Sequence, residues 1–106
     1  MSQATARVQG LIDQNKVVVF SKSYCPYCKA TKSTLSSLDA EFTVYELDQL
    51  PDGAETQDAL QVISGQRTVP NIFINQKHIG GNSDLQSLSQ SGELKKLLRE
   101  ANALKL

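Results

Sequence analysis

The chain has 106 residues, in which 11 lysines and arginines balance 11 aspartates and glutamates. A chain of this length can bury one hydrophobic core without disulfides or metals, so we expect residues 1–106 to form a single domain. The balanced charge gives no reason to expect binding to nucleic acid or to a membrane surface. The apolar runs are only a few residues long, too short to span a bilayer.

The amino-terminal residues and the cysteines indicate a compartment. Residues 1–16 contain no continuous apolar core of the kind found in secretory signals, and their composition is untypical of a transit peptide. The two cysteines are Cys25 and Cys28. Without a secretory signal, such a pair indicates a reducing compartment, where a lasting structural disulfide is not expected. We therefore expect a cytoplasmic protein.

The first half of the chain predicts a helix, a strand, a helix and a strand in that order. Apolar residues at helical spacing predict an amphipathic helix over residues 4–14. A short apolar run predicts a buried strand at residues 17–21, and alternating apolar and polar residues predict a second strand at residues 42–48. Between the two strands, helical periodicity covers residues 26–38. One face of this helix carries Cys28, Thr31, Leu35 and Leu38.

The middle of the chain predicts a third helix and a β-hairpin. Asp52 is followed three residues later by Glu55, which is the spacing of a capping box, so we expect Asp52 to begin a helix that ends at Gly65. An apolar run then predicts a strand at residues 71–74. A short turn leads into its expected hairpin partner at residues 77–80.

Two short helices are expected after the hairpin. Ser83 and Gln86 have the spacing of another capping box, with Ser83 as the N-cap. Gly92 interrupts the helical pattern, and a last helix follows as far as Ala101. The strand–helix–strand unit should be parallel and right-handed, and the hairpin should add antiparallel strands. The expected fold is α/β, with a central four-stranded mixed sheet and helices on both faces.

The cysteine pair lies where the first strand ends and the second helix begins. A thiol at that junction lies beside the unpaired N–H groups of the first helical turn, which favour the thiolate, the reactive form of cysteine. Lys22 and Lys29 flank the pair and act in the same direction. Pro26 suits the first helical position, because no N–H is needed there. Cys28 falls within the first turn and can approach Cys25, so the pattern predicts redox chemistry.

Three segments together resemble one family. A Cys-x-x-Cys pair after the first strand of a βαβ unit is typical of thioredoxin-like redox proteins. Cys25-Pro26-Tyr27-Cys28 resembles the active site of dithiol glutaredoxins, whereas thioredoxins typically carry Gly-Pro between the cysteines. Thr68-Val69-Pro70 resembles the cis-proline loop of the family, and Gly80-Gly81-Asn82-Ser83-Asp84 resembles its glutathione-holding segment. The resemblance looks closest to fungal cytosolic glutaredoxins.

The resemblance implies a thioredoxin-like fold and a glutathione-dependent thiol–disulfide oxidoreductase. Cys25 would be the nucleophile, and Cys28 would resolve mixed disulfides with protein substrates. Glutathione would be the reductant, and no metal is expected. The implied partners are glutathione, glutathionylated and disulfide-containing proteins and, indirectly, glutathione reductase. The chain would act as a monomer.

The implied glutathione groove matches the charges of the ligand, which carries two carboxylates and one ammonium. Lys22 and Gln66 would hold the glycine carboxylate, and the N–H groups that open the helix at Ser83 and Asp84 suit the γ-glutamyl carboxylate. The Asp84 side chain would take the ammonium, and the backbone of Val69 would pair with the cysteinyl unit. The expected glutathione-binding residues are Lys22, Tyr27, Gln66, Thr68, Val69, Pro70, Gly81, Asn82, Ser83 and Asp84.

The same residues also allow structural interpretations that involve no redox site. The two cysteines would supply only half of a zinc site, and with His78 as the one histidine the chain cannot complete the usual four ligands. Pro70 could be an ordinary trans proline at the edge of a strand, since few X-Pro bonds are cis. Gly80 and Gly81 could form a simple turn in which the following polar residues only cap a helix.

Three other functions are weighed against the redox enzyme. One is an iron–sulfur carrier that bridges a cluster between two chains, but by resemblance Pro26 counts against it, because cluster-binding relatives usually have glycine or serine there. Another is a glutathione-binding module without turnover, which would need neither cysteine. The third is a thioredoxin-type enzyme fed by its own reductase, and the segment from Gly80 to Asp84 distinguishes the chain from that class.

Overall fold

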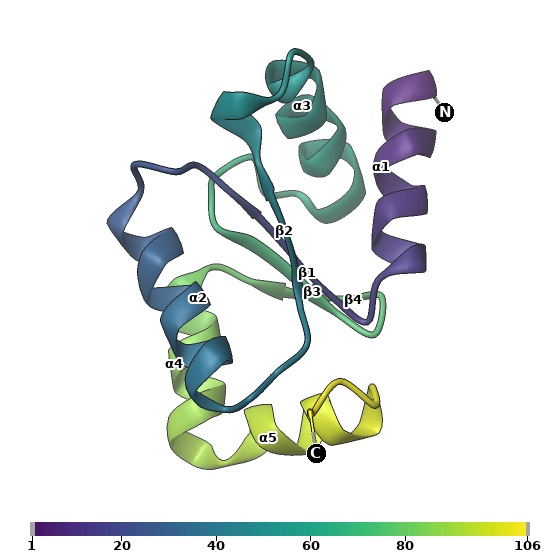
Figure 1. The fold of residues 1–106 in the computed structure, drawn as a ribbon. Coiled ribbons are helices and arrows are strands. Elements are labelled where there is room, and N and C mark those ends of the chain that lie inside the picture. Colours follow the sequence, from purple (N-terminus) through teal and green to yellow (C-terminus); the bar gives the residue numbers. More distant parts are fainter. Residues whose placement is uncertain (1, 106) are drawn as a thin grey trace.

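A four-stranded mixed sheet lies at the centre of the computed structural model, which describes residues 2–105 (Figure 1). β1 runs parallel to β2, whereas the pairs β1–β3 and β3–β4 are antiparallel. The predicted mixed sheet is confirmed, with the βαβ unit and the hairpin in their expected places. The strands are β1 (Val17–Ser21), β2 (Thr43–Glu46), β3 (Asn71–Ile74) and β4 (Lys77–Gly80), in the spatial order β2-β1-β3-β4.

Helices cover both faces of the sheet, as the sequence predicts. In Figure 1, α1 and α3 lie on one side of the sheet, and α2, α4 and α5 lie on the other. Within residues 2–105, no helix has the length and apolar character that a bilayer span requires. The helices are α1 (Gln3–Gln14), α2 (Pro26–Ser37), α3 (Gly53–Ser64), α4 (Asn82–Ser91) and α5 (Glu93–Glu100), with a short 3-10 helix, η1 (Leu47–Gln49), after β2.

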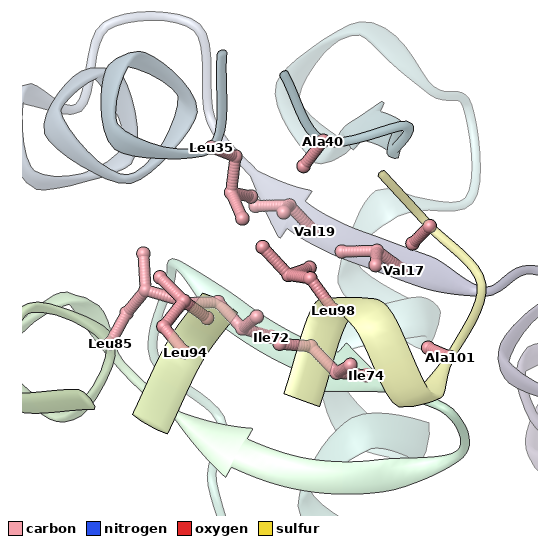
Figure 2. Packing of buried hydrophobic residues seen from close by; sticks show 11 residues of the cluster. Val17, Val19, Leu35, Ala40, Ile72, Ile74, Leu85, Leu94, Leu98 and Ala101 are labelled. Atoms are coloured by element: carbon pink, nitrogen blue, oxygen red, sulfur yellow. The ribbon is translucent and has the colours of Figure 1, made fainter. Parts of the chain in front are cut away.

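Alternating side chains of β1 divide the core into two layers. Val17 and Val19 face α2, α4 and α5, whereas Val18 and Phe20 face α1 and α3. All four side chains are buried, which explains why this strand is a continuous apolar run. Figure 2 shows the first layer, in which side chains of the helices meet those of β1 and β3. The second layer contains Val8, Ile12, Val18, Phe20, Leu47, Ala59, Leu60 and Phe73.

The second strand is shorter than the sequence predicts. Alternation indicated residues 42–48, but β2 ends at Glu46, which pairs with Ser21 at the end of β1. No residue of β1 extends beyond that pair, so the ladder stops there. Leu47 turns into the core as η1 begins, and Asp48 is brought to the loop that follows β1.

Helix α3 begins and ends where predicted, but it is not capped as predicted. Asp52 is the N-cap residue, yet its carboxylate pairs with the guanidinium of Arg7 in α1 at 3.1 Å. Arg7 also donates a hydrogen bond to the Thr56 hydroxyl at 3.0 Å. A contact between two helices thus replaces the local capping bond. The helix ends at Gly65, whose φ of 78° is left-handed, as expected for a C-cap glycine.

The capping box predicted at Ser83 is wrong. Helix α4 begins at Asn82 with Gly81 as its N-cap, so Ser83 lies inside the first turn. The carboxylate of Asp84 accepts the Gly81 N–H at 2.9 Å and takes the role expected of Gln86. The helix ends before Gly92, as predicted.

Two helical glycines should respond in opposite ways to alanine. At Gly53 an added Cβ would overlap the carbonyl oxygen of Leu47, because α3 starts directly against η1. At Gly10, in the middle of α1, nothing lies within 4 Å of an added Cβ. We expect Gly10→Ala to stabilise the protein by about 0.5–1 kcal/mol and Gly53→Ala to destabilise it by about 1–3 kcal/mol. Urea unfolding measures both, and stabilisation by both variants would contradict the close approach at Gly53.

Candidate active site

Cys25 lies at the junction of β1 and α2, as the sequence predicts. It is the N-cap of α2, with φ −86° and ψ 117°, and Pro26 follows at the start of the helix. The Cys28 N–H donates a hydrogen bond to the Cys25 sulfur at 3.2 Å. The sulfur thus takes the place of the side-chain oxygen of an ordinary N-cap, where the N–H groups of the first turn favour negative charge.

Cys28 differs from Cys25 in exposure, and its own pKa is raised. Both cysteines are free thiols, but Cys28 is fully buried while Cys25 is partly exposed. Burial raises the pKa of the Cys28 thiol, and its hydrogen bond with Cys25 raises this pKa further. Smaller contributions from the Lys22 backbone and the Ser21 hydroxyl lower it. Cys28 therefore stays protonated at neutral pH.

Asp48 holds the loop that leads from β1 to Cys25. Its carboxylate accepts hydrogen bonds from the Ser23 hydroxyl and from the Ser23 N–H, the latter at 3.0 Å. These two bonds lower the pKa of Asp48. The anchor is therefore complete above the ordinary carboxyl pKa of 3.8 and is lost only as the pH falls through the lowered pKa of the folded protein. No sequence pattern predicted this contact, because Ser23 and Asp48 lie 25 residues apart.

Amide side chains hold the loop before β3, in which the Val69–Pro70 peptide bond is cis. The cis form implied by resemblance is thus confirmed. Gln66 Nε2 donates hydrogen bonds to the carbonyl oxygens of Thr68 and Pro70, each at 3.0 Å. The buried Asn71 amide donates to the Gln66 carbonyl at 3.1 Å. Because Gln66 uses both amide hydrogens within the loop, a ligand carboxylate can bind there only by displacing one of these bonds.

The first turn of α4 presents N–H groups that have no partner within the helix. The Gly81 N–H is taken by the Asp84 carboxylate, whereas those of Asn82, Ser83 and Asp84 precede the first helical hydrogen bond. Gly80 has a φ of +119°, and a Cβ there would overlap the Asp84 carboxylate. Gly80 therefore has a steric reason beyond turn formation, and the N–H groups after it are of the kind that favour an anion.

Predicted site residues from three separate segments line one cavity of about 360 Å³. Tyr27 belongs to α2, the helix that begins directly after Cys25 and contains Cys28. Asp84 is not a lining residue, but its carboxylate accepts a hydrogen bond from Gly81, which is one. Lys22 and Gln66 are not among the lining residues. The lining residues are Tyr27, Thr68, Val69, Pro70, Gly81, Asn82 and Ser83.

Two cysteines that differ this much in burial can divide a disulfide exchange between them, one attacking and the other resolving. Among residues 2–105, no group of three or more His, Cys, Asp and Glu side chains is gathered as metal ligands would be. A cysteine pair at the start of the helix after β1, together with a cis proline directly before the neighbouring strand β3, on this four-stranded mixed sheet, defines a thiol–disulfide oxidoreductase of thioredoxin-like fold.

Comparisons with known proteins narrow this class. The sequence model of the glutaredoxin family matches residues 17–79. A glutaredoxin of Vernicia fordii is 50% identical over 102 residues, covering 96% of this chain and 98% of that protein. Glutaredoxin-1 of Saccharomyces cerevisiae is 50% identical over 103 residues, covering 92% of this chain and 94% of that protein. The crystal structure of a buckwheat glutaredoxin–glutathione complex matches with a TM-score of 0.93 at 43% identity, covering 96% of this chain and 93% of that one.

The chain belongs to the glutaredoxin family, because the family model covers more than half of it and relatives of similar length share half of its residues. Its reaction is glutathione-dependent thiol–disulfide exchange, and the Cys25–Cys28 pair makes it a dithiol enzyme. The family, fold and reaction class predicted from the sequence are confirmed.

The two thiols should react at different rates with iodoacetamide. Cys28 is buried and its pKa is raised, so it offers little accessible thiolate. At about pH 6 we expect Cys25 alone to be modified in the reduced, folded protein. Peptide mass spectrometry identifies the site, and the same reaction in urea should modify both cysteines. Equal modification of both in the folded protein would contradict the division of roles.

Proposed function

We propose that this glutaredoxin uses glutathione to reduce both protein–glutathione mixed disulfides and protein disulfides. The observation that supports this most directly is a partly exposed cysteine at the start of a helix that also holds a buried cysteine and, in Tyr27, a residue that lines a cavity. A thiol-bearing ligand with two carboxylates can bind in that cavity while its sulfur lies at Cys25.

Glutathione is proposed to lie across the cavity with its γ-glutamyl end at the start of α4. The N–H groups of Ser83 and Asp84 suit its carboxylate, and the Asp84 side chain suits its ammonium. The Val69 backbone pairs with the cysteinyl unit and directs its sulfur to Cys25. Lys22 takes the glycine carboxylate, and Gln66 joins it after giving up one bond within its loop. The walls are formed by Tyr27, Thr68, Pro70, Gly81 and Asn82.

Deglutathionylation then needs Cys25 alone. Its thiolate attacks the glutathione sulfur of the mixed disulfide, the old sulfur–sulfur bond breaks, and the substrate leaves as a thiolate that takes a proton from water. The enzyme is left with glutathione bound to Cys25. A second glutathione thiolate attacks that sulfur, which releases glutathione disulfide and restores the Cys25 thiolate.

Reduction of a protein disulfide needs both cysteines. Attack by Cys25 leaves the substrate tethered through one sulfur, and its other sulfur departs as a thiol. Cys28 loses its proton and attacks Cys25, which releases the second substrate thiol and forms the Cys25–Cys28 disulfide. The reach of Cys28 is supported by its hydrogen bond to the Cys25 sulfur. Two glutathione molecules then reduce the enzyme and leave as glutathione disulfide.

The chain is proposed to act as a single-domain monomer in the cytoplasm, with glutathione reductase restoring its reductant. Glutathionylated and disulfide-containing proteins are its proposed substrates. Pro26 between the cysteines supports this Cys-Pro-Tyr-Cys type over the iron–sulfur carrier. A closer relation to fungal cytosolic members stays a prediction, since the Vernicia fordii and yeast relatives are each 50% identical.

Replacing Cys28 should separate the two reactions. In Cys28→Ser the helix start and the cavity are unchanged, and release of glutathione from Cys25 never requires Cys28. We expect turnover of a glutathionylated peptide, coupled to glutathione reductase, to be kept. Reduction of an intramolecular protein disulfide should fall sharply, about 100-fold or more, because an intramolecular thiol has a large effective concentration. The tethered intermediate should then accumulate and be visible by mass spectrometry.

Cys25→Ser is the matched variant, and it should lose both activities. Coupling the wild-type enzyme to thioredoxin reductase in place of glutathione with its reductase should give no turnover. Two results would sink the proposal: equal rates with both reductants, or a Cys28→Ser variant that loses both reactions while Cys25→Ser keeps one.

The charge of Asp84 should matter for glutathione separately from its contact with Gly81. Asp84→Asn keeps an oxygen that can accept the Gly81 N–H but removes the charge that binds the ammonium. Losing a charge-assisted hydrogen bond costs roughly 1–3 kcal/mol, so we expect glutathionylated substrates to bind about tenfold to 100-fold more weakly. Steady-state kinetics measures this, with melting temperature as the control for the fold. Unchanged kinetics would place the ammonium elsewhere.

A further inference from the structure

Hydrogen bonds join α2, the helix at the cysteine pair, to α4, whose first residues line the cavity. The Thr31 hydroxyl of α2 donates to Asn82 Oδ1 at 2.9 Å. Gln86 Nε2, one turn further along α4, donates to the same oxygen at 3.0 Å. It also donates to the Thr34 hydroxyl of α2 at 2.9 Å. The first residue of α4 is thus tied to α2 by side chains of both helices.

The contact is protected from water on the α2 side. Thr31 is fully buried and lies one turn after Cys28, on the same face of the helix. A buried hydroxyl that loses its partner is unfavourable, so the arrangement with Asn82 is strongly preferred over one in which that side chain turns away. The position of Asn82 is therefore coupled to the helix that positions the thiols.

The two donors also fix which end of the Asn82 amide faces the network. An amide oxygen accepts two hydrogen bonds, and Thr31 and Gln86 supply both. The donor end, Nδ2, is the end outside the network, on a residue that lines the cavity. Beside it are the unpaired N–H groups of the first helical turn. With the amide held this way, this end of the cavity offers donors to a carboxylate; with the amide reversed, the carbonyl oxygen would repel it.

We infer that Thr31 and Gln86 are positioning residues that hold the Asn82 amide and the first turn of α4 in the orientation that receives the γ-glutamyl carboxylate. Neither lines the cavity, so both act through Asn82. The identity of the carboxylate rests on the function proposed above. The same contacts hold the first turn of α4, where the γ-glutamyl end would bind, at a fixed position relative to Cys25.

A pair of substitutions at Thr31 tests this. Thr31→Val removes the hydroxyl and keeps the shape of the side chain, while Thr31→Ser keeps the hydroxyl. Each reduced variant is reacted in a single turnover with one peptide carried in two mixed disulfides, with glutathione or with 2-mercaptoethanol, which has no carboxylate. We expect Thr31→Val to slow the glutathionyl reaction about two- to tenfold. The 2-mercaptoethanol reaction should keep its rate, and Thr31→Ser should behave as the wild type.

Two further variants complete the test. Gln86→Met removes the other donor at similar side-chain length and should slow the glutathionyl reaction alone, which decides the matter if Thr31→Val fails to fold. Ser33→Ala removes an exposed hydroxyl of α2 and should change neither rate. Equal slowing of both reactions, or no slowing by Thr31→Val and Gln86→Met, would overturn the positioning role. If the wild type itself did not favour the glutathionyl peptide, the proposed glutathione groove would fail instead.

Discussion

The antiparallel register between β1 and β3 is the constraint on which the site depends. It pairs Phe20, near the end of β1, with Asn71, the first residue of β3. The end of β1, where the chain continues to Cys25, therefore lies beside the start of β3, which the chain enters from Pro70. Because Ile72 pairs with Gly80, the end of β4 lies at the same end of the sheet. A shift of one residue in either register would turn core side chains outward and separate these three segments.

Depth within the first turn of α2 gives the two cysteines different chemistry. Cys25 lies before the helix, partly exposed, and its sulfur accepts a helix N–H. Cys28 lies three residues later, on the face that packs against the sheet, where burial raises its pKa. The same helical geometry that buries Leu35 therefore buries the Cys28 thiol and leaves the Cys25 sulfur at the helix start. The start of one helix thus holds a partly exposed thiol and a buried one.

Polar side chains hold the loops and the helix start around these thiols. Asp48 fixes the loop before Cys25, Gln66 and Asn71 fix the cis-proline loop, and Asp84 fixes the turn before α4. Each forms hydrogen bonds to backbone groups that no helix or strand satisfies. The Asp84 bond also orients the backbone N–H groups of Asn82 and Ser83 in the first turn of α4.

The sequence by itself determined the order of helices and strands, the helix start at the cysteines and the family. Those features depend on local periodicity, on Pro26 and the glycines, and on short motifs. Each of these signals lies within a few consecutive residues. It could not give the end of β2, the partner of Asp52 or the true cap of α4. No sequence pattern predicted the Asp48 anchor. None predicted the contact between Thr31 and Asn82, which lie 51 residues apart. Only the tertiary structure decided these, because a polar side chain has several possible partners of equal chemistry, and the packing of the sheet and helices selects which one is near.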